Sequence, residues 1–215
     1  ATTGVVAAAS GPQPSASDNL VRCHAAELDA LLEGADRAAF AEYVAGLRAV
    51  TPPTTKDTLP GILPNVVAAR IANRYDLGGV TMLVDSGFTA VHVAARQLAH
   101  GELDMALVLG VSANSRPEFA RFMGLGDVAE GAFLLALARE SVARAHGLGP
   151  LTRLGSAWQR APRRAPVAGE TFAAADGVLA VLRALHADAA ETSVGPADGE
   201  PGPVITLRRQ TRSSR

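Results

Sequence analysis

The sequence contains a single cysteine, Cys23, among its 215 residues. One cysteine can form neither an internal disulfide nor a cysteine-rich zinc site. A lone thiol is usual in proteins of the reducing cytosol, so we predict a cytoplasmic protein. The histidines show no ligand-like spacing with one another or with carboxylates. We therefore predict neither a metal site nor another cofactor.

Long hydrophobic runs and an excess of one charge are also lacking. No apolar run reaches the roughly 18–20 residues that a transmembrane helix needs, and residues 1–10 lack the basic leading segment of a signal peptide. The formal net charge is −1, which argues against nucleic acid and anionic membranes as main partners. Basic residues cluster weakly at 160–164 and 208–215. These segments are either solvated chain or a patch for an acidic carrier protein. Lys56 is the only lysine, a bias typical of a GC-rich bacterial genome.

Hydrophobic residues make up 48% of the chain and fall into patterns typical of an α/β fold. Apolar runs at 3–10, 80–84, 104–111 and 131–138 predict strands. The near-continuous run at 80–84 is typical of a sheet covered on both faces, and 3–10 and 104–111 also predict buried strands. Helical spacing predicts helices at 27–50, 60–75 and 88–100, with Gly34 making two helices as plausible as one in the first segment. Strand, helix and strand across 80–111 form a βαβ unit, which predicts parallel strands.

The remaining patterns are shorter. Residues 15–19 supply capping side chains, and Asp18 or Asn19 could begin a helix. A helical turn is expected at 118–123, a strand at 151–158 on the other edge of the sheet, and a helix at 171–186. The polar segment 187–203 predicts a loop, and 204–207 a last strand. Together these patterns predict one α/β domain with a mixed sheet and covering helices.

Three consecutive motifs resemble those of β-ketoacyl synthases. The segment LPNVVAARIANRYDLGG at 63–79, with the strand that ends in Val84-Asp85, resembles the family's stretch before its nucleophile. HVAARQLAHGE at 92–102 resembles H-L-A-x-x-x-L-x-x-G-E, and DMALVLGV at 104–111 resembles D-x-A-L-x-G-G-V. Weaker likenesses lie at 3–11, 169–185 and 203–208.

The resemblance implies a thiolase-like α/β fold in a shortened ketosynthase. In this interpretation residues 1–215 form a single domain. Residues 1–158 resemble the N-terminal half of a ketosynthase, 159–168 form a linker, and 169–215 are a remnant of the C-terminal half. The family forms dimers through the sheet that holds the active site, so the resemblance also implies a dimer.

The family's catalytic residues are missing from this sequence. In ketosynthases the Val-Asp pair is followed by T-A-C-S-S-S, whose cysteine is the nucleophile at a helix N-terminus. Counting three residues on from Asp85 reaches Phe88, whereas counting back from His92 implies that about one helical turn is deleted. Neither alignment supplies a cysteine. The H-G-T-G-T motif has no counterpart, and Glu170 stands in place of the second histidine.

A few residues remain as candidates for chemistry or binding. Ser86 follows a strand and precedes a helix, so it is either an activated nucleophile or a helix cap. The spacing from Ser86 to His92 does not place their side chains together if the helix begins near Phe88, and His92 matches a family position that is not catalytic. The side chains that could line or close an acyl tunnel, or simply pack in the core, are Met82, Phe88 and Phe122.

These observations support two hypotheses about function. In the first, the chain is a non-condensing ketosynthase-like protein of polyketide or fatty-acid biosynthesis. It would act as a homodimer, or as a partner subunit of a ketosynthase or acyl carrier protein, by analogy with chain-length factors. In the second, it is an acyl hydrolase, acyltransferase or dehydratase that acts on carrier-bound chains through Ser86, or through a carboxylate such as Asp85 or Glu170.

Overall fold

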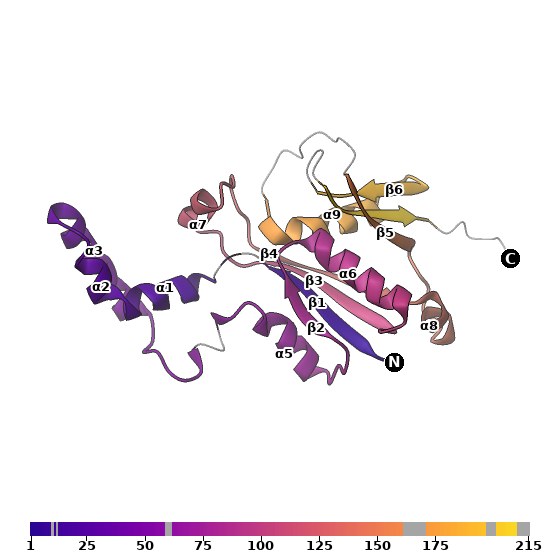
Figure 1. Ribbon diagram of the computed structural model, residues 1–215, viewed down its shortest axis with the longest axis horizontal. Coiled ribbons are helices and arrows are strands. Elements are labelled where there is room, and N and C mark those ends of the chain that lie inside the picture. Colours follow the sequence, from indigo (N-terminus) through magenta and orange to yellow (C-terminus); the bar gives the residue numbers. More distant parts are fainter. Residues whose placement is uncertain (10, 12, 59–61, 161–170, 197–200, 210–215) are drawn as a thin grey trace.

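The structure is a computed structural model that describes residues 1–9, 11, 13–58, 62–160, 171–196 and 201–209 (Figure 1). Its elements in chain order are β1 (Thr3–Ala9), α1 (Pro14–Cys23), α2 (Ala25–Asp29), α3 (Gly34–Val50), α5 (Val66–Arg74), β2 (Thr81–Val84), α6 (Gly87–His100), β3 (Met105–Ser112), α7 (Pro117–Phe122), β4 (Gly131–Ala138), α8 (Glu140–Ala145), β5 (Arg153–Arg160), a 3₁₀ turn (Ala173–Ala175), α9 (Asp176–Leu185), β6 (Glu191–Val194) and β7 (Pro201–Arg208).

The larger sheet has four strands in the order β2-β1-β3-β4. β1 pairs in parallel with both β2 and β3, and β4 pairs antiparallel with β3. The parallel βαβ unit expected from the sequence is therefore confirmed, but β1 lies between its two strands. The apolar residues of β1 explain its central place, because Val5 and Val6 have no solvent exposure and fill both faces of the sheet.

Helices cover both faces of this sheet (Figure 1). α5 packs on one face against β1 and β2, while α6 and α9 pack on the other. A second sheet of three antiparallel strands, in the order β5-β7-β6, covers the far side of α6 and α9. The main hydrophobic core lies between the two sheets, and Val91, Val178 and Ile205 are fully buried there.

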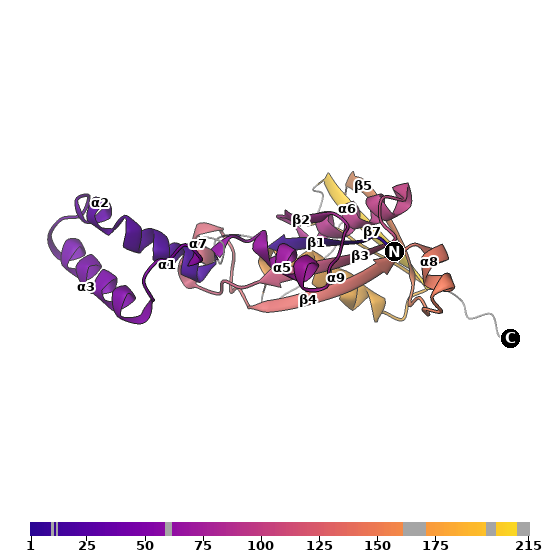
Figure 2. The same cartoon turned by 90° about the horizontal axis from the view of Figure 1, so that it is seen from below.

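Helices α1, α2 and α3 project away from the sheets and form a helical arm, residues 13–58 (Figures 1 and 2). The arm has a small apolar contact of its own, because Ala25, Val44 and Leu47 are buried. Several of its other large apolar side chains, including Leu31 and Val50, are more than three-quarters exposed. The arm therefore depends on few contacts for its position.

The N-terminal half of the chain follows the sequence patterns closely. The segment 27–50 belongs to two helices, and Gly34 begins the second with φ +56°. The first helix begins at Pro14 rather than at Asp18 or Asn19, because proline fits the first helical position, where no backbone N–H is needed.

The C-terminal half departs further from the predictions. The segment expected as a strand on the other edge of the sheet is β5, which belongs to the second sheet and pairs with β7. The segment expected as a loop contains β6, which pairs with the other side of β7. β5 includes the first two residues of the expected linker, and residues 161–168 of that linker lie outside the described residues.

Among the described residues, no helix is long and apolar enough to cross a membrane. Within the same part of the chain, His, Cys, Asp and Glu side chains form no group of three or more that could hold a metal ion.

Candidate functional site

The candidate nucleophile, Ser86, lies between the end of β2 and the start of α6. Ser86 is the N-cap residue of α6 and has extended backbone angles, φ −140° and ψ 134°. Its carbonyl accepts a hydrogen bond from the N–H of Ala90 at 2.9 Å, but its hydroxyl makes no capping hydrogen bond. Ser86 therefore occupies the cap position without using its side chain as a cap.

The N-termini of α6 and α9 touch each other through glycines. A Cβ atom on Gly87 would lie 2.6 Å from the backbone nitrogen of Val178, and one on Gly177 would lie 2.3 Å from the nitrogen of Phe88. Real Cβ atoms do not approach other atoms so closely, so only glycine permits this contact. The start of α6 is consequently held against the start of α9.

The turn before α9 is fixed by Asp176. Its carboxylate accepts a hydrogen bond from the Phe172 N–H at 2.8 Å and another from the Thr171 hydroxyl. Ala173 has φ +50°, a backbone conformation that costs energy for any residue but glycine. The ring of Phe172 meets the ring of Phe133 edge to face, with the ring centroids 5.0 Å apart. Glu170, expected at the position of a family histidine, lies outside the described residues.

The predicted acyl-pocket residues do not gather in one place. Met82 and Phe88 are partly buried and pack against the main core cluster. Phe122, by contrast, ends α7 with 85% of its surface exposed. The structure thus places Phe88 and Met82 in the packing around α6 and Phe122 on the surface.

His92 points toward the second sheet rather than toward Ser86. Its Nδ1 atom lies 2.6 Å from the Ser156 hydroxyl of β5, and its ring meets Trp158 edge to face with the centroids 6.0 Å apart. Burial, and secondarily the charge of Arg96, lower the pKa of His92 below its ordinary value. In the part of the chain that the structure describes, Ser86 therefore has no histidine partner. The structure pairs His92 with a serine 64 residues further along the chain, which no local sequence pattern indicated.

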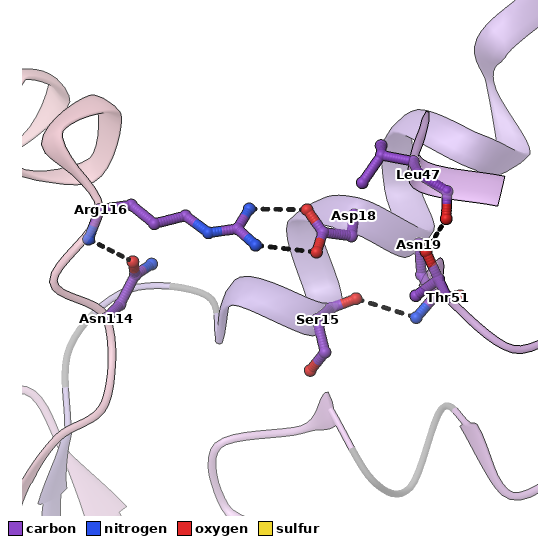
Figure 3. Close-up of polar contacts among 7 residues, drawn as sticks. All are labelled: Ser15, Asp18, Asn19, Leu47, Thr51, Asn114 and Arg116. Atoms are coloured by element: carbon purple, nitrogen blue, oxygen red, sulfur yellow. Dashed lines mark hydrogen bonds and ion pairs between the residues drawn. The ribbon is translucent and has the colours of Figure 1, made fainter. Parts of the chain in front are cut away.

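Sequence reasoning also missed the contact that joins the helical arm to the rest of the molecule (Figure 3). The guanidinium of Arg116 donates two hydrogen bonds to the carboxylate of Asp18, at 2.6 and 2.8 Å. The backbone N–H of Arg116 donates to Asn114 Oδ1 at 3.2 Å. The hydrogen bonds from Arg116 hold the pKa of Asp18 below its ordinary value.

A small pocket lies beside this contact, at the carboxyl ends of β1 and β3. In α/β sheets this edge is a usual place for ligands. The pocket is lined by Ala9, Gly11, Gln13, Pro64, Val67, Val111, Ala113 and Asn114. None of these side chains is an acid, a base or a strong nucleophile, so the pocket offers shape and hydrogen bonds but no proton-transfer group.

Comparison with known proteins connects this geometry to a family. Residues 34–127 match the family model of the β-ketoacyl synthase N-terminal domain. The chain is 32% identical over 131 residues to the spectinabilin polyketide synthase system protein NorA of Streptomyces orinoci, and 35% identical over 81 residues to the highly reducing polyketide synthase azaB of Aspergillus niger. These alignments cover 50% and 34% of this chain, but only 7% and 3% of the two relatives.

Solved structures share the fold. A β-ketoacyl synthase from Burkholderia phymatum STM815 superimposes with a TM-score of 0.63 at 14% identity, over 98% of this chain and 76% of that one. A type II polyketide synthase ketosynthase in complex with its acyl-carrier protein, AntDE:AntF, gives a TM-score of 0.50 at 15% identity, over 75% of this chain and 45% of that one. At such identities the likeness concerns the fold alone. Family match and fold agree: residues 34–127 match the β-ketoacyl synthase N-terminal domain, and the chain has the thiolase-like α/β fold of ketosynthases.

Proposed function

We propose that this chain is a non-condensing ketosynthase-like protein of polyketide or fatty-acid biosynthesis, which acts as a partner subunit of a ketosynthase or acyl carrier protein. One observation carries the proposal. At the start of α6, where the family has its cysteine, this chain has Ser86, Gly87 and Phe88, and Phe88 packs against the core. Cys23 is exposed in α1, a different element.

The chemistry of condensation explains why this replacement matters. A ketosynthase must hold an acyl group as a thioester, and a helix N-terminus favours the thiolate that forms it. A phenyl ring cannot carry an acyl group. The scaffold that would position the thiol is nevertheless kept, because the glycine contact still fixes α6 against α9. A retained scaffold without its nucleophile supports a role in binding rather than in condensation.

The free edge of the larger sheet offers a surface for a partner subunit. β2 is an edge strand in the sheet order of the described residues. The Val80 carbonyl accepts a hydrogen bond from the Val5 N–H of β1 at 2.8 Å. In a trans peptide the C=O and the next N–H point in opposite directions, so the Thr81 N–H points away from β1. An edge strand with outward N–H and C=O groups can pair with a second chain.

Co-purification with a cysteine-bearing ketosynthase and a carrier protein from the same gene neighbourhood tests the proposal. We expect a stoichiometric complex in size-exclusion chromatography, together with a change in the chain length of the product that the ketosynthase makes. The isolated chain should form no condensation product. Elution of the chain without any of these proteins, together with an unchanged product, would contradict the partner role.

A proline substitution in β2 tests whether the partner subunit binds at the free edge of the larger sheet. Thr81→Pro removes the outward N–H and leaves the ladder with β1 intact, because edge strands tolerate proline on their open side. We expect this variant to lose at least tenfold in affinity for the partner, measured by titration calorimetry. Thr81→Val keeps the N–H and serves as the matched control. Equal affinity of both variants would place the interface elsewhere.

A further inference from the structure

A serine and a histidine meet at the boundary between α6 and the second sheet. The distance of 2.6 Å between His92 Nδ1 and Ser156 Oγ is within the range at which a base activates a serine nucleophile. Ser86 is the N-cap residue of α6, six positions before His92, and among the described residues its hydroxyl makes no hydrogen bond to His92. The Ser156–His92 pair is therefore distinct from the site inherited from the family.

The surroundings of this pair suit an acyl group. Alternate residues of β5 face the same side of the sheet, so Leu154, Ser156 and Trp158 form a row along the face toward α6. Leu154 packs against the core, Ser156 is partly buried, and Trp158 is 61% exposed. In register beside Ser156 on β7 lies the fully buried Ile205. The hydroxyl thus sits between an apolar interior and an exposed aromatic ring.

A cation lies on the same helix, one turn beyond the histidine. Arg96 follows His92 by four residues and is exposed, and its charge acts on the His92 ring. The burial of the ring, and secondarily this charge, lower the pKa of His92 and so favour the neutral imidazole, the state in which Nδ1 can accept a proton. Because Arg96 is exposed and its charge reaches the His92 ring, it can attract an anionic group on a molecule bound at this pair.

We propose that Ser156 and His92 form a nucleophile–base pair that hydrolyses acyl thioesters carrying an anionic group. This activity goes beyond the partner role proposed above and does not depend on it. The Ser156 oxygen bonds to the acyl carbonyl carbon while its proton passes to His92 Nδ1. The carbon–sulfur bond then breaks, and the departing thiolate takes that proton. Water attacks the acyl-serine and gives its proton to His92, which returns it to Ser156 as the free acid leaves.

The first test is labelling of the isolated chain with a fluorescent fluorophosphonate, with the modified peptide identified by mass spectrometry. We expect the label on Ser156, no label in Ser156→Ala, and labelling at least about tenfold slower in His92→Gln. Ser193→Ala is the matched control, because Ser193 lies in the same sheet and shares its hydrogen bond with Thr206 rather than with a histidine. Circular dichroism melts verify that each variant is folded.

The second test follows thiol release from two thioesters. Butyryl-coenzyme A is anionic and S-butyryl-N-acetylcysteamine is neutral, so they separate the role of Arg96 from that of the pair. We expect Ser156→Ala to abolish turnover of both thioesters, whereas Arg96→Gln should raise KM at least fivefold more for the anionic thioester than for the neutral one. No labelling of the folded wild-type chain, labelling centred on Ser86, or thiol release that survives in Ser156→Ala would overturn the proposal.

Discussion

At the scale of single residues, an ion pair joins the helical arm to the rest of the described structure. Asp18 is a charged residue in a largely buried place, with 12% of its side chain exposed, and both of its oxygens accept hydrogen bonds from Arg116. Such a carboxylate is tolerated only with its partner, because burial without one disfavours the charge. The hydrogen bonds within the arm join its own segments instead. For example, Arg22 of α1 donates to the Pro52 carbonyl, which follows α3, at 2.6 Å.

Removing the charge of Asp18 should therefore loosen the arm. We expect Asp18→Asn to lower the free energy of unfolding by about 1 kcal/mol, because the pair is charge-assisted but Arg116 is 40% exposed and screened by solvent. Limited proteolysis within residues 51–58 should become faster. Arg37→Gln breaks an exposed pair with Asp29 inside the arm and is the control. Equal cleavage rates in both variants would show that the Asp18 pair does not hold the arm.

The same pair predicts a dependence on pH. The pKa of folded Asp18 lies below its ordinary value of 3.8, because Arg116 stabilises the carboxylate. Stability from this source is fully present above that ordinary value and is lost as the pH falls through the folded pKa. Urea unfolding of wild type and Asp18→Asn should therefore differ by a constant amount at neutral pH and converge in strong acid. A difference that persists below the folded pKa would contradict the assignment.

At the scale of elements, the contact between α6 and α9 organises the centre of the molecule. Both helices lie between the two sheets, and their N-termini approach so closely that Gly87 and Gly177 cannot carry a side chain. Val178 and Val181 of α9 are fully or almost fully buried in the core beside α6. This contact, rather than any one catalytic group, determines where Ser86 and Phe88 lie.

Adding a methyl group at this contact should separate the helices. We expect Gly177→Ala to lower the free energy of unfolding by at least about 2–3 kcal/mol, because the new Cβ would overlap the backbone of Phe88. Gly46→Ala is the control, since Gly46 is in the interior of α3 and a Cβ there meets no atom within 4 Å. That change should raise stability by about 0.5–1 kcal/mol. Chemical denaturation measures both, and a neutral Gly177→Ala would refute the close contact.

At the scale of the whole molecule, restoring a thiol should not restore condensation. The family mechanism needs a cysteine and two histidines from separate segments, and this sequence lacks the H-G-T-G-T motif altogether. We expect Phe88→Cys, made in a Cys23→Ser background, to give no condensation product by mass spectrometry. The loss of the ring from the core should also cost about 2–3 kcal/mol of stability. Formation of product would show that the scaffold supplies the missing acid–base groups.

Much of the fold could be predicted from periodicity. The apolar runs of β1, β3 and β4 are strands. β1 and β3 are buried, as their near-continuous apolar sequence indicates, whereas β4 exposes alternate residues such as Leu134. The segment between β2 and β3 has helical spacing and is α6. β6 was missed because Glu191 to Val194 is short and largely polar. Its pairing with β7 comes from the tertiary arrangement, not from local propensity.

The sequence by itself determined the family motifs, the absence of the cysteine, and the alternation of strands and helices, because these are properties of neighbouring residues. The tertiary structure decided that β1 lies between β2 and β3, that β5 joins a second sheet, and that Phe122 is exposed. It also decided which side chains meet, as Asp18 meets Arg116 across 98 residues and His92 meets Ser156 across 64. Contacts at such separations depend on how whole elements pack, and no local pattern encodes that packing.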